Sequence, residues 1–312
     1  MDIKTASVAL IFAGQGNPTI GMGADLWDIN NTTKAIWDCA SDISGTDIRR
    51  VCLKGPMNKL VQTTNQQVAV TAINATLYAL CRDRLGEARI TGSCGHSVGE
   101  YAALYAAGAV TLDDLFRMIH FRSRLMDELS KVNKGAMQAV KGIDYSSMAA
   151  LIADSGIGVD ISCDNSRRQQ VIGGTVAALR EMTEVLMAQG VETTKLGVSG
   201  AWHTRLMDDG VQQMRDFLAN IAIQTPQHEV LMNVTGEPVT DPAEIKENLA
   251  LHLTHTVKWT ASMMRFLSQP SPVTFVEVSN KAYLGHMLND FDGFSPTMAL
   301  HCRKLSDTHG DL

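Results

Sequence analysis

The pentapeptide Gly-His-Ser-Val-Gly at residues 95–99 constrains this chain more than any other stretch. It fits the pattern Gly-x-Ser-x-Gly, in which a serine stands on a sharp turn between a strand and a helix. The glycines let the backbone turn tightly beside the side chain. The following helix directs its free N–H groups at any oxygen that becomes negative there. The sequence therefore predicts a nucleophile at Ser97, with a glycine-rich turn and an idle serine as the alternative.

The flanking residues favour this strand–turn–helix context. The residues just before Gly95 are small, as in a short buried strand, and residues 100–107 are rich in helix formers. Upstream, the continuous apolar run at residues 8–12 is typical of a central parallel strand. The Gly-Gln-Gly that follows lacks the third glycine of a dinucleotide fingerprint, so nucleotide binding is not expected.

Composition excludes several classes of protein. With 45% hydrophobic residues, the 312-residue chain can bury a sizeable core, and a net charge of −6 argues against a nucleic-acid binder. The six cysteines show no C-x-x-C spacing and predict neither disulfides nor a zinc site. No apolar run approaches the roughly 18 residues of a membrane span. We expect a cytoplasmic protein with no membrane contact.

Strands alternate with helices along most of the chain, which predicts an α/β fold with a mostly parallel sheet. The predicted order of elements changes at about residue 134, where strand–helix–strand–strand–helix–strand follows, as in a ferredoxin-like domain. We therefore expect a discontinuous, α/β-hydrolase-like large domain at residues 1–133 and 199–312. The insert at residues 134–198 is expected to be a small ferredoxin-like domain.

A serine hydroxyl needs a base within hydrogen-bond reach before it can attack. Of the nine histidines, His203 follows a predicted strand in a loop of small residues, which places it on the sheet edge that carries Ser97. His96 is expected to orient the turn or line the pocket. His252 and His255 have a spacing that suits a metal pair, but no third ligand accompanies them and we expect no metal. No acid stands out as a third member of a triad.

Arg122 lies on the helix predicted over residues 112–132. A lone arginine on a helix is usually a solvated surface charge. The alternative is a guanidinium fork that binds a substrate carboxylate through two parallel hydrogen bonds. The residues alone leave both interpretations open.

Several stretches in register resemble the malonyl-CoA:acyl-carrier-protein transacylases and the acyltransferases of polyketide synthases. They follow the order and spacings of that family across nearly the whole chain. They lie at residues 12–16, 21–23, 95–101, 122–126, 135–137, 165–166, 198–203, 233–234 and 257–259.

The resemblance implies a ping-pong acyl transfer. Ser97 would attack the thioester of malonyl-CoA with His203 as its base, and a backbone carbonyl rather than an acid would hold the histidine. Backbone N–H groups of Gln15 and Val98 would form the oxyanion hole. The acyl group would then pass to the phosphopantetheine thiol of an acyl carrier protein.

The resemblance also assigns the substrate contacts. Arg122 would clamp the free carboxylate of the malonyl group and His96 would line the pocket. CoA thioester and carrier-bound phosphopantetheine are then substrates, and no bound cofactor or metal is required. A monomer is implied.

Three departures from the family pattern stand out. Trp202 precedes the histidine, and its large ring predicts a preference for malonyl over methylmalonyl donors. His252 stands where glutamine or asparagine is usual, which is tolerable if its backbone carbonyl holds His203 but changes the geometry if its side chain matters. Ser279, Asn280 and Lys281 replace the usual Gly-Pro-Gly turn.

A hydrolase that removes acyl groups from carrier proteins on the same scaffold is the alternative function. Arg122 favours the transferase, because a carboxylate clamp suits a malonyl donor and not a simple acyl chain. A non-enzymatic docking scaffold would need a broken dyad, yet Ser97 and His203 are both present. Fatty acid, polyketide and malonate decarboxylase contexts all remain open.

Overall fold

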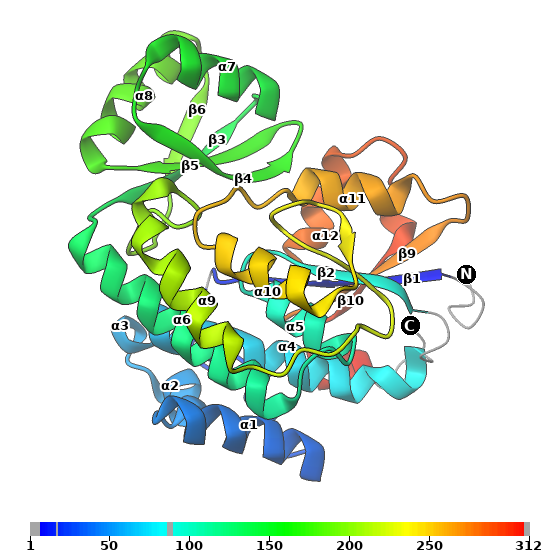
Figure 1. Cartoon of the computed structure of the whole chain (residues 1–312). Helices are drawn as coiled ribbons and strands as arrows, with labels where there is room; N and C mark the ends of the chain where they lie inside the picture. The colour runs from blue at the N-terminus through cyan, green and yellow to red at the C-terminus, as the bar shows by residue number, and fades with distance from the viewer. Residues whose placement is uncertain (1–6, 17, 86–89, 309–312) are drawn as a thin grey trace.

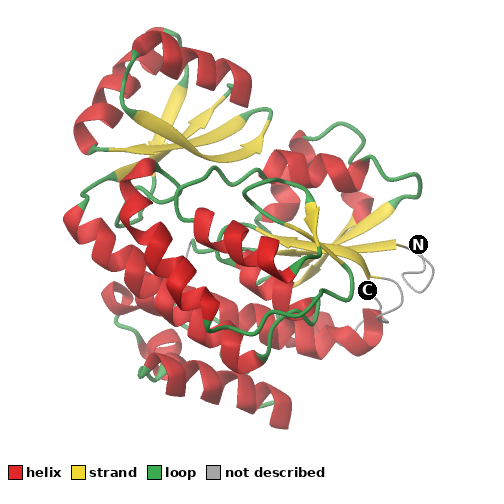
Figure 2. Cartoon of the chain, viewed as in Figure 1, coloured by secondary structure: helices red, strands yellow, loops and turns green. Residues whose placement is uncertain are grey.

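The computed structural model describes residues 7–16, 18–85 and 90–308. It contains a six-stranded sheet of order β10-β9-β1-β2-β7-β8 and a four-stranded sheet of order β4-β5-β3-β6. Figure 1 shows the four-stranded unit (green) standing above the part of the molecule built on the larger sheet. Figure 2 separates the strands of the two sheets from the surrounding helices.

The larger sheet is parallel except at one edge, as predicted. Its central strand β1 (Ser7–Phe12) lies between β2 (Ile90–Gly95) and β9 (Val273–Val278) and is parallel to both. The next strands outward, β7 (Glu229–Leu231) and β10 (Ala299–Cys302), are also parallel. Only β8 (Pro238–Val239) is antiparallel. The apolar residues of β1 are buried on both faces, which is why this strand reads as a continuous apolar run.

Helices cover this sheet, and α1, α4, α5 and α6 lie below it in the view of Figure 1. The α-helices of this part are α1 (Asn31–Ser44), α2 (Ile48–Lys54), α3 (Met57–Leu60), α4 (Thr63–Leu85), α5 (Gly99–Ala106), α6 (Leu112–Val132), α9 (Val211–Ala219), α10 (Pro242–Leu251), α11 (Trp259–Leu267) and α12 (Leu284–Met287). Short 3₁₀ turns are η3 (Arg205–Gly210), η4 (Leu288–Asp290), η5 (Pro296–Met298) and η6 (Leu305–Thr308).

Helix α6, which carries Arg122, begins and ends where the sequence predicts. The Thr111 side chain caps it by accepting from the Asp114 N–H, and Asp113 and Asp114 stand in its first turn, where acidic groups complement the helix dipole. It packs against α1 and α4. A long helix capped in this way gives Arg122 a fixed position.

The smaller unit follows the predicted order of elements. It comprises β3 (Ala136–Lys141), α7 (Tyr145–Ser155), β4 (Val159–Ser166), β5 (Gln169–Gly174), α8 (Val176–Ala188) and β6 (Glu192–Lys195). All strand pairs are antiparallel, and the unit has its own apolar core. The apolar and β-branched residues at 191–198 predict a longer last strand, but β6 ends at Lys195, and Leu196, Gly197 and Val198 line a cavity.

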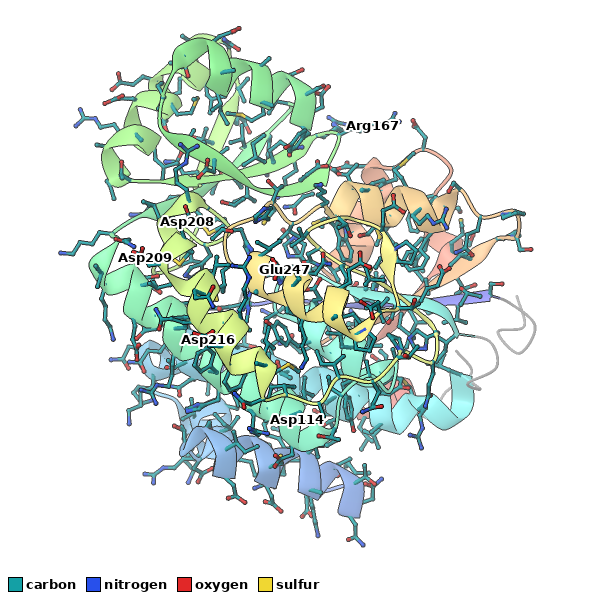
Figure 3. All side chains as sticks on the ribbon, viewed as in Figure 1. Asp114, Arg167, Asp208, Asp209, Asp216 and Glu247 are labelled. Atoms are coloured by element: carbon teal, nitrogen blue, oxygen red, sulfur yellow. The ribbon has the colours of Figure 1, made fainter. Side chains whose placement is uncertain are left out.

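The sequence predicts one continuous helix at residues 206–221 and another at residues 26–41, and the structure differs in both places. The helix expected over residues 206–221 is the 3₁₀ turn η3 followed by α9, and Gly210 at the junction packs so closely on Leu129 that a side chain would clash. The helix expected from residue 26 begins at Asn31, because Asn30 and Thr33 form a capping box there. Helices α9 and α10 pack together, and Arg215 donates to Glu247 of α10 across them (Figure 3).

Strand β4 joins the two parts. The Val257 N–H donates to Ser162 O and the Asp164 N–H donates to Val257 O, each at 2.9 Å. At the far end of β4, Arg167 (labelled in Figure 3) donates to Asp292 at 2.6 Å. The two sheets are therefore held in a fixed relation around the space between them. Among the described residues, no helix is long and apolar enough to cross a membrane.

Candidate active site

The turn between β2 and α5 holds Ser97 in a strained conformation, with φ at +51°. A Cβ at Gly95 would lie 1.9 Å from the Gly99 carbonyl carbon, and one at Gly99 would lie 2.2 Å from Phe12 O. Only glycine fits at either position. The pattern of the pentapeptide therefore follows from the closeness of this turn, and the turn presents Ser97 at the carboxyl edge of the sheet.

Ser97 and His203 come together although 106 residues separate them: Ser97 Oγ lies 2.8 Å from His203 Nε2. On the other side of the ring, His203 Nδ1 lies 2.7 Å from the backbone carbonyl of His252, so Nδ1 carries the proton and Nε2 is free to accept one. Burial lowers the pKa of His203 well below its usual value, and the nearby His252 and Arg122 lower it further. The imidazole is neutral at pH 7, as a base for the serine must be.

The backbone N–H groups of Gln15 and Val98 belong to the two segments that meet at Ser97. Within the described ranges, neither the Val98 nor the Gln15 N–H has a hydrogen-bond partner. The loop carrying Gln15 lies directly on the turn, since a Cβ at Gly14 would be 2.3 Å from His96 O. The Gln15 side chain is held by Gln66 at 3.0 Å and Gln67 at 3.2 Å. This arrangement suits stabilisation of a developing oxyanion.

Arg122 is fully buried on the other side of Ser97. Its Nη1 donates to Gln67 Oε1 at 2.6 Å and its Nη2 donates to Ser97 Oγ at 3.2 Å. The guanidinium lies over the Tyr101 ring, 5.6 Å from its centroid. Its Nε has no partner, and no described carboxylate lies within ion-pair distance. A buried cation without an anion is costly, so this group is poised to receive one.

A cavity of about 340 Å³ opens between the two parts of the molecule. Of the residues singled out in the sequence, Gln15, His96, Ser97, Trp202 and His203 line it. Val98, Arg122 and His252 lie behind this lining. The small unit contributes a mainly apolar wall that also carries the amide of Asn165: Met137, Cys163, Asn165, Val171, Leu196 and Val198. Further lining from the large part comes from Gln66, Asn280, Lys281 and Tyr283.

His96 and Trp202 are fixed by neighbours that the sequence did not reveal. His96 Nε2 lies 2.8 Å from Asn165 Oδ1, and burial lowers the pKa of its ring. The Trp202 Nε1–H donates to Ser130 Oγ at 3.3 Å.

The pair His252 and His255 does not form a metal site, because His255 is exposed while His252 is buried. The described residues include no group of three potential metal ligands.

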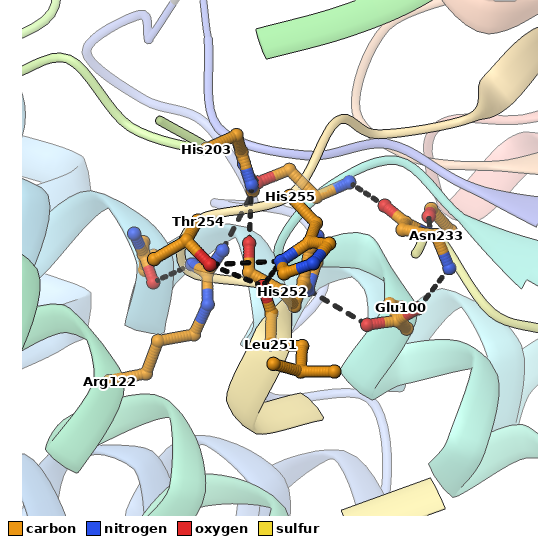
Figure 4. A network of polar contacts seen from close by, with 11 residues as sticks. Glu100, Arg122, His203, Asn233, Leu251, His252, Thr254 and His255 are labelled. Carbon is orange, nitrogen blue, oxygen red and sulfur yellow. Dashed lines mark hydrogen bonds and ion pairs between the residues drawn. The ribbon is translucent and has the colours of Figure 1, made fainter. Parts of the chain in front are cut away.

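Sequence reasoning assigned no role to three residues that organise the site: Asn233, Glu100 and Gln67. Asn233 Oδ1 accepts from the Ser97 N–H at 2.8 Å, and its Nδ2 donates to Gly95 O at 2.7 Å. The Glu100 carboxyl is buried between the Asn233 backbone and the His252 ring (Figure 4). Asn233 and Glu100 stand in stretches that carry the resemblance, whereas Gln67 is one of several polar residues of α4 and is not marked out by the sequence.

The sequence pattern of the acyl transferase domain family matches residues 9–292. The chain belongs to this family. It is 34% identical over 279 residues to the polyketide biosynthesis malonyl CoA-acyl carrier protein transacylase PksC of Bacillus subtilis, covering 87% of this chain and 92% of that protein. It is also 34% identical over 283 residues to the polyketide biosynthesis protein ThaF of Burkholderia thailandensis, covering 90% of this chain but only 24% of that longer protein.

The fold is similar to that of the malonyl CoA-acyl carrier protein transacylase FabD from Coxiella burnetii, with a TM-score of 0.90 at 25% identity over 97% of this chain and 96% of that one. The crystal structure of FabD from Acinetobacter baumannii superposes with a TM-score of 0.89 at 28% sequence identity, covering 97% of this chain and 96% of that one. The mixed α/β architecture with a mainly parallel sheet is therefore confirmed by comparison as well as by the strand order.

Proposed function

We propose that this protein transfers a malonyl group from malonyl-CoA to the phosphopantetheine thiol of an acyl carrier protein through an acyl-Ser97 intermediate. One observation carries the proposal: a buried, unpaired guanidinium contacts the oxygen of a serine that already has its base. PksC of Bacillus subtilis and FabD of Coxiella burnetii are both named malonyl CoA-acyl carrier protein transacylases, and these names support the same donor and acceptor.

The reaction begins with proton transfer from Ser97 Oγ to His203 Nε2 as Oγ attacks the thioester carbonyl. The negative oxygen that forms is stabilised by the N–H groups of Gln15 and Val98. The carbon–sulfur bond then breaks, and the imidazolium returns its proton to the departing CoA thiolate. The carrier thiol reverses these steps: His203 accepts its proton, sulfur attacks the ester, and Ser97 leaves with the proton.

Arg122 supplies the donor specificity. Gln67 occupies Nη1, which leaves the edge formed by Nη2 and Nε for a carboxylate. Two parallel hydrogen bonds from that edge would hold the malonyl carboxylate beside the ester. Acyl groups without a carboxylate would leave the buried cation unpaired, so a hydrolase for simple acyl chains remains the less supported alternative.

Trp202 sets the space around the donor. Its ring lines the cavity next to His203 and is held by Ser130. We propose that it disfavours a methyl group on the malonyl α-carbon, and that the small Trp202→Ala side chain relaxes this preference for malonyl over methylmalonyl. His96, held by Asn165, would keep the wall opposite in place.

The proposal also includes the domain division, the localisation, the oligomeric state and the lack of a cofactor. The large domain, residues 1–133 and 199–312, is taken as α/β-hydrolase-like and the insert at residues 134–198 as ferredoxin-like. The enzyme would act as a cytoplasmic monomer without a metal or bound cofactor. The six cysteines, all unpaired, are consistent with a reducing compartment.

The test is the fate of the acyl group. Malonyl-CoA and a phosphopantetheinylated carrier protein are mixed with the enzyme, and malonyl-carrier and free malonate are both quantified. We expect malonyl-carrier as the main product, with none formed by Ser97→Ala. Free malonate as the main product, formed at the same rate without carrier protein, would favour the hydrolase.

A further inference from the structure

A buried chain of contacts runs behind the dyad and joins the nucleophile to the base (Figure 4). At its centre, Glu100 in the first turn of α5 is fully buried. Its Oε1 accepts from the Asn233 N–H at 2.5 Å, and its Oε2 lies 2.8 Å from His252 Nδ1. These two atoms are in close contact, although their orientation is not that of an aligned hydrogen bond.

Each end of this chain reaches a reacting group. Asn233 accepts from the Ser97 N–H and donates to Gly95 O, so it fixes the turn that presents the nucleophile. The His252 carbonyl accepts from His203 Nδ1–H, so the position of residue 252 sets the direction of the base. The His252 ring is also fully buried, 4.8 Å from the His203 ring between centroids. The Glu100 carboxyl thus contacts both Asn233, which holds the Ser97 turn, and His252, which holds the base.

We propose that Glu100 and the His252 side chain form a positioning pair that aligns Ser97 and His203 for proton transfer. The inference rests on the proposed function only in taking Ser97 as the nucleophile. It gives the unusual His252 a role for its ring as well as for its backbone carbonyl. Neither side chain lines the cavity or contacts Ser97 Oγ, whereas the buried Arg122 reaches that oxygen directly, so the pair acts through the turn and the base and not on the acyl group.

The electrostatics of the pair fit this role. Burial raises the pKa of Glu100 to about 8 and lowers the pKa of His252, so both groups favour their neutral forms. A protonated carboxyl donates through one oxygen and accepts through the other. Glutamine has the same shape and the same donor–acceptor pattern, whereas leucine offers neither contact. This difference provides a matched pair of variants at one position.

The experiment measures acylation of Ser97 in a single turnover by intact mass, at several malonyl-CoA concentrations. Glu100→Leu is expected to lower the maximal acylation rate by about 10²-fold, since a misplacement near 1 Å costs that much. The half-saturating concentration should stay within about 3-fold, because Arg122 is untouched. Glu100→Gln should keep the rate within about 10-fold of the original protein, because the amide can still make both contacts.

The control is Ile245→Ala, a cavity in the core of α10 about two turns before His252. It should lower the melting temperature, as truncation of a core side chain does, while leaving the maximal acylation rate unchanged. The positioning pair is wrong if Glu100→Leu acylates at the original rate. It is also wrong if Ile245→Ala loses as much rate as Glu100→Leu.

A second probe separates this inference from the proposed function. A fluorophosphonate reacts with an activated serine and carries no carboxylate, so its labelling of Ser97 reports alignment of the dyad alone. We expect the same order of rates: original protein, then Glu100→Gln, then Glu100→Leu. If malonyl-CoA fails to acylate the original protein but this order holds, the donor is wrong and the positioning pair stands. Equal labelling of all three proteins overturns the pair.

Discussion

The two sides of Ser97 are both buried, yet burial has opposite consequences on them. On one side, burial lowers the pKa of the His203 imidazole and makes the ring a neutral base. On the other side, burial also lowers the pKa of Arg122, but a guanidinium stays charged in proteins. The same removal of water thus makes His203 a neutral proton acceptor and leaves Arg122 a cation without an anionic partner.

The supports of the two sides differ accordingly. His203 is oriented by a backbone carbonyl, which no substitution at residue 252 removes directly. Arg122 is oriented by the side chain of Gln67, which a single substitution does remove. We therefore expect changes on the histidine side to affect every donor. Changes on the arginine side should affect only donors with a carboxylate.

The largest expected effect is on the histidine side. His203→Ala removes the base and should reduce acyl transfer by about 10⁴-fold or more for malonyl-CoA and acetyl-CoA alike. The measurement is kcat/KM with each donor. A loss confined to malonyl-CoA would mean that His203 binds the donor rather than activating Ser97.

The next effect is on the arginine side and is selective. Gln67→Ala leaves the Arg122 guanidinium without its Nη1 acceptor and should lower kcat/KM for malonyl-CoA by about 10-fold to 10²-fold, the cost of a hydrogen bond to a charged group. Acetyl-CoA turnover should change by less than about 3-fold, because that donor makes no ion pair. Equal losses with both donors would show that Gln67 acts through the Gln15 loop, which it also contacts, rather than through the clamp.

The smallest effect links the two sides through charge. The Arg122 cation lowers the pKa of His203, so Arg122→Gln should raise that pKa toward the ordinary value of about 6.5. Because the neutral ring is the base, serine labelling by a fluorophosphonate is lost as pH falls through this pKa. The acid limb of labelling should therefore lie well below pH 6.5 in the original protein and move to higher pH in Arg122→Gln.

The matched control is Arg124→Gln on the same helix. Arg124 is exposed and paired with Glu128, so its removal should leave the acid limb in place. An acid limb that moves equally in both variants would assign the shift to net charge and not to the buried cation.

How far the sequence predicted this molecule depends on how local each signal is. The turn at Ser97 was predictable because glycines at residues 95 and 99 report a local close approach. Helix α6 was predictable from its cap at Thr111 and its apolar period. The strand β1 was predictable because its continuous apolar run is also a signal within one short stretch.

The supports of the site were not predictable, because they depend on contacts across the fold. The sequence could not decide whether Arg122 is buried or solvated, because its burial depends on contacts such as the one with Gln67 of α4. Nothing near Glu100 in the sequence indicates Asn233 or His252, which lie more than 130 residues away. The short strand β10 also escaped prediction, since it is four residues long and only Cys302 of it is buried.

The measurement that tests the central claim most directly is the mass of the acyl-enzyme formed from an equimolar mixture of malonyl-CoA and acetyl-CoA. The original protein should carry malonyl on Ser97 almost exclusively. Arg122→Ala should lose about 10²-fold to 10³-fold in malonyl acylation, the cost of removing one partner of a buried charge pair, while acetyl acylation persists. Malonyl preference that survives in Arg122→Ala would contradict the account, because the unpaired guanidinium beside Ser97 would then have no part in choosing the donor.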